Sequence, residues 1–159
     1  MVTTEYNQCV DAYADRLYRF ALKVIGSNDQ AHQVVKEAFA SLWDQKSSLP
    51  LKEVKAFLFS VAYQKLAAHS LVKTEKGSAL FEADQNKDQN SLRYLLDKGL
   101  DELNAKQKAL LILRDYEGSS YDEIASITDI KTEQIKTEIY RARKELKSYL
   151  VKARFSAWS

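Results

Sequence analysis

Apolar residues recur at steps of three and four along the first part of the chain, the spacing that lines one face of a helix. The first stripe runs from Tyr6 to Val24, and Gly26 is a natural stop after it. A second stripe follows a candidate cap, Asn28 or Asp29. Its inward positions are expected to be Ala31, Val35, Ala38 and Leu42, with Phe39 and Trp43 close beside them. The pattern predicts two consecutive helices.

Pro50 indicates the start of a third helix over residues 51–72, because proline is well tolerated in a helix's first turn. Its inward residues are expected to be Val54, Phe57, Leu58, Val61, Leu66 and Leu71. Residues 74–90 then hold few apolar side chains and no sustained period. This segment is typical of a flexible linker between two blocks.

Periodic apolar residues return from Ser91 onward. Leu110, Leu111 and Leu113 give one helix of this second block a broad apolar face, and Gly118 is a natural left-handed stop after it. With only four Gly and one Pro in 159 residues, the chain has few of the residues that strands and tight turns need. We expect an all-α protein made of two small helical domains.

The second block ends in a short helix, a tight turn and a long helix. Ser120 and Glu123 have the spacing of a capping box at the start of a helix over residues 121–127. Thr132 is the expected cap of the long helix. The inward residues of that helix are expected to be Ile135, Ile139, Ala142, Leu146 and Leu150. Two helices joined in this way form a helix-turn-helix.

The outward face of the last helix carries cations and hydroxyl groups, although the formal net charge of the chain is only +2. A recognition helix reads base edges near its N-terminus and contacts phosphates beside them. The expected DNA-binding residues are Thr132, Gln134, Lys136, Thr137, Arg141, Arg143 and Lys144. A solvated face over a small helical core would carry the same residues, and the pattern alone leaves both interpretations open.

The remaining composition argues against other classes of protein. The single cysteine, Cys9, cannot form an internal disulfide, and no His or Cys spacing indicates a metal site or a cofactor. Paired carboxylates, a Gly-rich phosphate loop and a nucleophile motif do not stand out either, so an enzyme is not expected. Without a signal-peptide pattern or a long apolar run, we expect a cytoplasmic protein that does not insert into a membrane.

The two blocks, in this order, resemble a sigma factor of the extracytoplasmic-function (ECF) group. The C-terminal motifs that carry the resemblance are DEIA and, further along, RARKEL. The N-terminal ones are DQAHQVVKEAFASLWD and VKAFLFSVAYQKLAAHS. The resemblance implies that residues 1–73 form sigma domain 2, that residues 74–90 are the linker, and that residues 91–159 form sigma domain 4, which binds the −35 promoter element.

The resemblance also implies roles for the N-terminal block. Contacts to core RNA polymerase would come from Gln33, Lys36, Glu37 and Phe39, and contacts to the −10 element from Tyr63, Gln64, Lys65, His69 and Lys73. Helical spacing favours a core position for Phe39 and Trp43 instead. Tyr63, Gln64 and Ala68 depart from the family's usual Arg-Asn and Asp in the melting helix, and Asn104 replaces a frequent Pro.

The function implied is that of a factor that binds the clamp and flap of core RNA polymerase and directs it to promoters. An anti-sigma factor is the further partner that the resemblance implies. Because the −10 helix is divergent, an alternative stays open: a degenerate sigma-like regulator that binds DNA or protein and no longer melts promoters.

Overall fold

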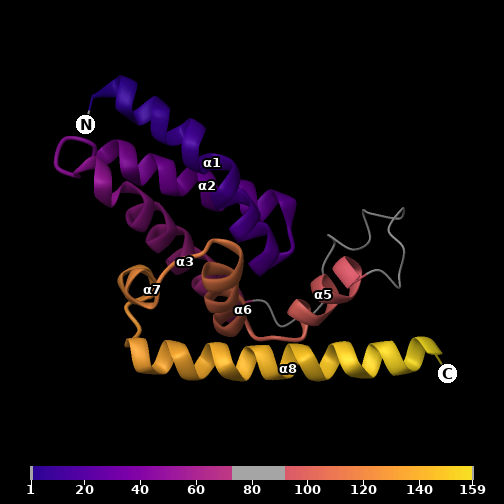
Figure 1. Ribbon diagram of the computed structural model, residues 1–159. Coiled ribbons are helices and arrows are strands. Elements are labelled where there is room, and N and C mark those ends of the chain that lie inside the picture. Colours follow the sequence, from indigo (N-terminus) through magenta and orange to yellow (C-terminus); the bar gives the residue numbers. More distant parts are fainter. Residues whose placement is uncertain (1, 73–91, 159) are drawn as a thin grey trace.

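The computed structural model describes residues 2–72 and 92–158, which form helices and the turns that join them (Figure 1). The N-terminal half consists of α1 (Thr3–Ile25), α2 (Asn28–Asp44), the 3₁₀ turn η1 (Leu51–Glu53) and α3 (Val54–Val72). The C-terminal half consists of α5 (Leu92–Asp101), α6 (Ala105–Leu111), the π-helical turn η2 (Ile112–Tyr116), α7 (Tyr121–Thr128) and α8 (Thr132–Trp158). The all-α prediction is confirmed.

The first three helices pack on one another around aliphatic and aromatic side chains. Leu17, Phe20 and Leu42 are fully buried there, and the rings of Phe20 and Phe59 lie 5.4 Å apart between centroids. The apolar stripes predicted for α1 and α2 therefore face this core. Leu58 is buried as expected, together with Phe59 and Ala62, which the sequence pattern did not single out.

Some local predictions for this half are confirmed and others are wrong. Gly26 adopts φ 72° and ends α1, as expected. The cap of α2 is Ser27, whose side chain accepts a hydrogen bond from the Gln30 N–H, so neither Asn28 nor Asp29 has that role. Trp43 is 43% exposed rather than in the core. Val35, Phe57 and Val61 are half-buried at the edge of the core, and the Leu71 side chain lies outside the described residues.

In the C-terminal half, α6 and α7 cover the inner face of α8 (Figure 1). Asn104, at the position where the family often has Pro, caps α6 by accepting a hydrogen bond from the Gln107 N–H at 2.8 Å. After α6 the helix widens into η2, where the Glu117 N–H donates to the Ile112 carbonyl five residues back. Gly118 has φ 70°, the left-handed conformation expected for it.

The two halves contact each other directly, since α3 packs against α6 and α7, and α1 packs against α6. Polar contacts join them as well: Arg16 pairs with Glu117 at 2.7 Å, and the buried Lys108 donates to the Val24 carbonyl at 3.3 Å. The predicted linker, residues 74–90, lies outside the described residues. In the described part of the chain, no helix is both long enough and apolar enough to cross a bilayer.

Candidate nucleic-acid interface

The turn between α7 and α8 is fixed by three local hydrogen bonds. Asp129 adopts φ 60°, and its N–H donates to the Ala125 carbonyl at 2.8 Å. The Thr128 hydroxyl donates to the Ile124 carbonyl at 2.8 Å and accepts from the Ile130 N–H at 3.3 Å. The helix-turn-helix predicted from the sequence is therefore present, with its second helix held at a defined angle by the turn.

The two predicted helix caps of this motif are only partly correct. The Ser120 hydroxyl accepts a hydrogen bond from the Glu123 N–H at 3.1 Å, which is one half of the expected capping box. The Glu123 carboxylate lies 3.8 Å from the Lys55 ammonium of α3. Thr132 is the first residue of α8 rather than its cap, and the carbonyl of Lys131 accepts the first helical hydrogen bond, from the Ile135 N–H.

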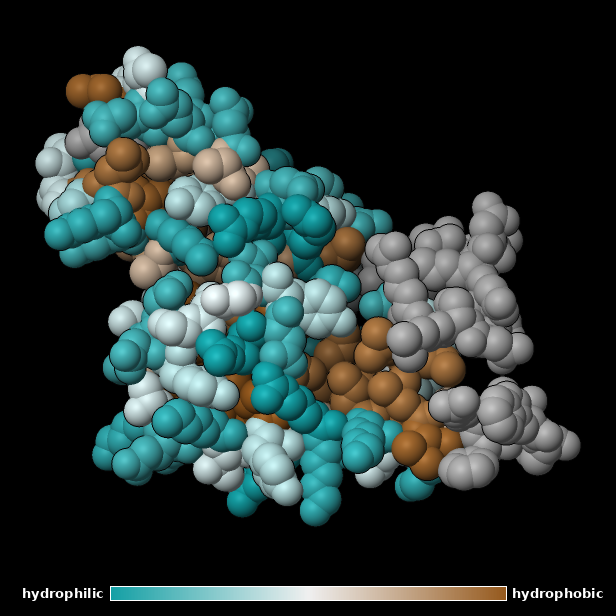
Figure 2. All heavy atoms as spheres, in the orientation of Figure 1, coloured by the Kyte–Doolittle hydropathy of each residue, from teal (hydrophilic) through white to brown (hydrophobic). Residues whose placement is uncertain are grey.

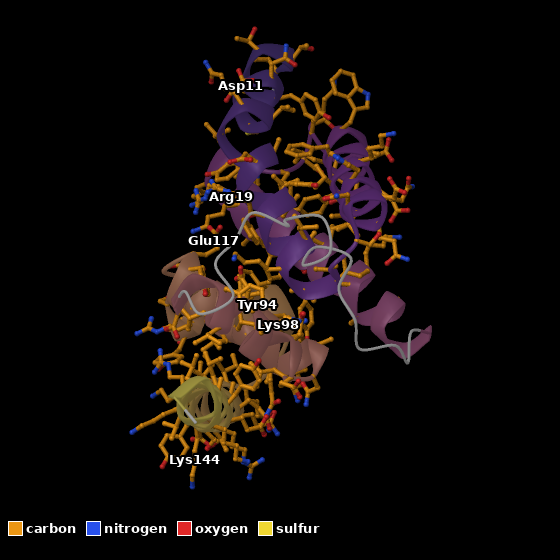
Figure 3. The ribbon with its side chains drawn as sticks, turned by 90° about the vertical axis from the view of Figure 1, so that its right-hand side faces the viewer. Asp11, Arg19, Tyr94, Lys98, Glu117 and Lys144 are labelled. Carbon is orange, nitrogen blue, oxygen red and sulfur yellow. The ribbon has the colours of Figure 1, made fainter. Side chains whose placement is uncertain are left out.

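The inner and outer faces of α8 are divided as the sequence predicted. Ile135, Ile139 and Ala142 are at most 1% exposed, and Leu146 and Leu150 are half-buried. Seen nearly end-on, α8 presents Lys144 away from the other helices (Figure 3). Of the expected DNA-binding residues, Thr132 is half-buried, and the exposed ones are Gln134, Lys136, Thr137, Arg141, Arg143 and Lys144. The rim formed by α8 is mainly hydrophilic in Figure 2.

A shallow polar groove runs along one side of this face. It is lined by Lys106, Glu133, Gln134, Thr137, Glu138 and Arg141. The Thr137 hydroxyl donates to the Glu133 carbonyl at 3.1 Å, and the Arg141 guanidinium lies 3.5 Å from the Glu138 carboxylate. Lys106 of α6 was not predicted as a site residue, because the helical stripe of α8 carries no signal for a neighbour from another helix.

The other side of the same face lies against η2 and the start of α7. Arg143 forms two hydrogen bonds with the Asp115 carboxylate, which raise the pKa of Arg143 above its usual value. Arg114 donates to the Ser119 carbonyl at 2.9 Å and lies 4.3 Å from the centre of the Tyr121 ring. The Lys136 ammonium lies 5.3 Å from the centre of that ring.

The expected polymerase-binding residues lie on α2. Gln33 and Lys36 are exposed and Glu37 is half-buried. The Gln33 amide donates to the Glu37 carboxylate at 3.0 Å, and Lys65 of α3 lies 3.5 Å from the same carboxylate. Residues assigned to polymerase and to the −10 element are thus brought together here. Phe39 is only 7% exposed, which confirms the core interpretation.

The expected −10 residues other than Lys73, which lies outside the described residues, belong to α3, which packs against the C-terminal half. Tyr63 is half-buried and shares an apolar cleft of about 180 Å³ with residues of both halves. The cleft is lined by Val24, Tyr63, Leu66, Ala67, Ala105, Lys106 and Ala109. Burial raises the pKa of the Tyr63 hydroxyl. Gln64 and Lys65 are exposed, whereas the side chains of His69 and Lys73 lie outside the described residues.

The helix-turn-helix and the whole chain are similar to known sigma factors. A model of sigma-70, region 4, matches residues 93–146, which include α6, α7 and the first part of α8. The chain is 25% identical over 149 residues to RNA polymerase sigma factor SigV of Bacillus subtilis, an alignment that covers 91% of this chain and 90% of SigV. Residues 93–146 thus match the sigma-70 region 4 family, and over most of its length the chain is similar to extracytoplasmic-function sigma factors.

The chain is also 25% identical, over 162 aligned positions, to ECF RNA polymerase sigma factor SigE of Mycolicibacterium smegmatis. That alignment covers 92% of the chain and 62% of SigE. The fold is similar to that of the sigma factor RpoE from Bartonella quintana, solved in complex with the anti-sigma factor NepR (TM-score 0.74, 22% identity, 93% of this chain and 98% of that one). It is also similar to CnrH, solved with the cytosolic domain of CnrY (TM-score 0.69, 18% identity, 92% and 88% covered).

Proposed function

We propose that this chain is an alternative sigma factor, which binds core RNA polymerase and directs it to specific promoters. The observation that carries the proposal is the helix-turn-helix within the matched sigma-70 segment, whose last helix turns polar and basic side chains outward. In this proposal residues 1–73 form the polymerase and −10 region, residues 74–90 the linker, and residues 91–159 the −35 region. Bond formation belongs to the polymerase, so the factor itself is not an enzyme.

The −35 element would be read by the first turns of α8. Gln134, Lys136 and Thr137 are exposed there, at the end of a recognition helix that enters the major groove in proteins of this architecture. Arg141 and Lys144 lie one and two turns further along and would contact phosphates. Each phosphate that they neutralise releases a counterion, so binding should weaken as the salt concentration rises.

The N-terminal half would supply the remaining contacts. Gln33, Lys36 and Glu37 of α2 are the proposed contacts to the polymerase clamp, and Gln64 and Lys65 of α3 the proposed contacts to the −10 element. Tyr63 would stack on an unpaired base, as aromatic side chains do in single-strand recognition. Its position in the cleft against Ala105 and Ala109 means that stacking requires the two halves to move apart.

The polymerase flap and an anti-sigma factor are the further partners that we propose. The similar folds of RpoE and CnrH were solved in complex with NepR and with the cytosolic domain of CnrY, respectively. A factor that acts on core polymerase and chromosomal promoters works in the cytoplasm, and we expect this chain to be found there.

The test is in vitro transcription with core RNA polymerase of the source organism and a library of its promoter fragments. We expect promoter-specific transcripts that depend on this chain and that are lost when Arg141 and Lys144 are both replaced by Ala. A matched control replaces Arg19 and Lys52 of the N-terminal half by Ala, which removes the same charge from exposed positions away from α8. This control should keep the transcripts.

The alternative, a degenerate sigma-like regulator, gives a different result in the same assay. Its motivation is the divergent α3, where Tyr63, Gln64 and Ala68 stand in place of the usual residues, and where Tyr63 lies against the C-terminal half. Core binding without a transcript from any fragment would support this alternative. Absence of both core binding and transcripts would contradict the sigma-factor proposal and would restrict the alternative to a regulator that binds DNA or another protein.

A further inference from the structure

Asp115 and Arg143 connect η2 to the recognition helix through a two-pronged ion pair. The Arg143 Nε donates to the Asp115 Oδ2 at 3.1 Å, and its Nη2 donates to Oδ1 of the same carboxylate. Paired hydrogen bonds of this kind fix the plane and direction of a guanidinium group. They are the geometry in which a surface ion pair has a measurable effect, whereas most such pairs contribute little.

The position of Arg143 on α8 differs from that of the other cations. At about 100° per residue, Arg143 stands only about 40° around the helix from the buried Ile139, whereas Lys144 stands about 140° from it. Arg143 therefore lies where α8 meets η2 and α7, and Lys144 points outward (Figure 3). The side chain of Arg143 is 49% exposed, and that of Asp115 is 38% exposed.

Two other cations on this flank are also directed at protein groups. Arg114, the residue before Asp115, donates to the Ser119 carbonyl and lies over the Tyr121 ring. Lys136 lies near the same ring, one helical turn from the start of α8. The flank is thus organised around the contact between the two helices of the motif, whereas Arg141 and Lys144 belong to the open face.

We propose that Arg143 is a positioning residue, which sets the rotation of the recognition helix through Asp115, and that it does not contact a DNA phosphate. The phosphate contacts of this face then come from Arg141 and Lys144. The proposal rests on the proposed function, because it assigns a specificity-determining pair to the −35 interface and gives Arg143 a role other than the one expected from its charge.

The effect of Asp115→Asn on DNA affinity distinguishes a positioning role for Arg143 from a phosphate contact. Asp115→Asn removes a negative charge from the flank of a DNA-binding surface, which on Coulomb grounds alone favours binding to any DNA. If Asp115 only competes with phosphate for Arg143, this variant binds all duplexes more tightly. If Asp115 holds Arg143 so that α8 presents Gln134 and Thr137 correctly, the variant loses discrimination between sequences instead.

The experiment uses the full chain and the duplexes that the wild-type protein enriches from a random library. Affinity for an enriched duplex and for a scrambled one is measured over a series of KCl concentrations. The variants are Asp115→Asn, Arg143→Ala, Arg143→Lys and the exchange of Asp115→Arg with Arg143→Asp. Arg141→Ala is the phosphate control, which should make the negative slope of log K against log[KCl] less steep by about 0.9.

We expect Asp115→Asn, Arg143→Ala and Arg143→Lys each to lower the ratio of specific to non-specific affinity about tenfold, the size of one good base contact, with the salt slope unchanged. The exchange of the two charges should restore the ratio. Tighter binding to both duplexes by Asp115→Asn, or a salt slope less steep by about 0.9 in Arg143→Ala, would overturn the proposal.

Arg143→Lys keeps the proposal testable if the other variants do not fold, because it retains the charge and loses only the forked geometry. An unchanged ratio and slope in this variant would make Arg143 a simple phosphate contact. A wild-type protein that enriches no sequence overturns the proposed function, and this inference with it, and that result is visible before any variant is measured.

Discussion

Lys108 carries a charge into the contact between the two halves. It is 7% exposed, and its ammonium donates to the Val24 carbonyl and, at 3.2 Å, to the Asp101 carboxylate. Val24 lies in the last turn of α1, where carbonyl groups lack helical partners and attract cations. Burial nevertheless raises the pKa of Asp101, an effect that Lys108 opposes without cancelling it.

Asp101→Asn is therefore expected to stabilise the protein at neutral pH. The pKa of Asp101 in the folded state is raised above 3.8. Between 3.8 and this raised pKa, Asp101 keeps its proton in the folded state and has lost it in the unfolded state. The stability contributed by Asp101 therefore falls as the pH rises through this range. Thermal unfolding should show a higher Tm for the variant at pH 7, and the difference should disappear as the pH falls through the raised pKa of Asp101 to 3.8. The exposed Asp11→Asn is the control, and a lower Tm at pH 7 for Asp101→Asn would contradict the prediction.

Sequence periodicity places apolar residues well and amphipathic or charged ones poorly. Trp43 was expected in the core, yet its ring lies between Tyr6, 4.9 Å away by centroids, and the Lys46 ammonium, 3.2 Å from its centre. A cation over the ring face and a second ring at its edge stabilise an aromatic side chain at the surface. Lys108 is the opposite case, because its burial depends on the end of α1, which is 84 residues away in the chain.

At the scale of elements, residues with left-handed backbone lie on both sides of α7. Gly118 (φ 70°) precedes the helix, and Asp129 (φ 60°) follows it. This conformation costs non-glycine residues about 1–2 kcal/mol, although Asp tolerates it better than most. The turn between η2 and α7 therefore uses a glycine in this conformation, whereas the turn between α7 and α8 uses a residue that is not a glycine.

Opposite stability changes are expected from Gly118→Ala and Asp129→Gly. Gly118→Ala should lower the free energy of unfolding by about 1 kcal/mol through φ alone, since a Cβ there would meet no atom within 4 Å. Asp129→Gly should raise it by up to about 1 kcal/mol, less the greater entropy of Gly in the unfolded chain. Urea denaturation measures both, with Asp129→Ala as the matched control. A destabilised Asp129→Gly variant would show that the Asp side chain itself supports the turn.

The helices were largely predictable because each one carries its own apolar stripe, and the bounds of α7 differ from the expected range by a single residue. Their caps were less predictable, because Ser27 and Asn28 are both good caps and only the local backbone decides between them. The outward face of α8 followed from the same stripe. The pairing of Asp115 with Arg143 did not, since it depends on a π-helical turn that leaves no periodic signal.

At the scale of the whole molecule, ion pairs join the N-terminal and C-terminal halves along the surface where they meet, the seam. Glu117 lies at this border (Figure 3), where it accepts two hydrogen bonds from Arg16 at 3.1 and 2.7 Å. The Glu117 side chain is only 11% exposed, so its charge depends on Arg16 for compensation. Lys23 and Asp97 lie 3.7 Å apart on the same seam.

Arg16→Glu is expected to separate the two halves, because it places a second carboxylate beside one that is nearly buried. Small-angle X-ray scattering should then give a larger radius of gyration than the wild type has. Combining Arg16→Glu with Glu117→Arg should restore the compact form. Arg19→Glu is the matched control, since Arg19 is exposed and pairs with Asp15 of its own helix. A radius unchanged by Arg16→Glu would show that apolar contacts alone hold the seam.

The seam itself could not be predicted from the sequence. A polar segment between two helical blocks indicates that they are separate units, and it contains no information about which faces meet. The pairs along the seam join residues about 70 to 100 positions apart, and each residue taken alone is an ordinary surface charge. Periodicity identifies a buried face, but it cannot distinguish burial within a domain from burial between domains.

The π-helical turn η2 also restricts changes in the length of the chain between α6 and α7. In η2 one more residue is accommodated per turn than in an α-helix, so Arg114, Asp115, Tyr116 and Glu117 reach different neighbours: Tyr121, Arg143, Lys23 and Arg16. Deleting a single residue here would restore α-helical spacing, so the remaining side chains of this turn would no longer point at the same neighbours. All four contacts would lose register together. A substitution in this π-helical turn removes one contact at a time, whereas a one-residue deletion would disturb all four.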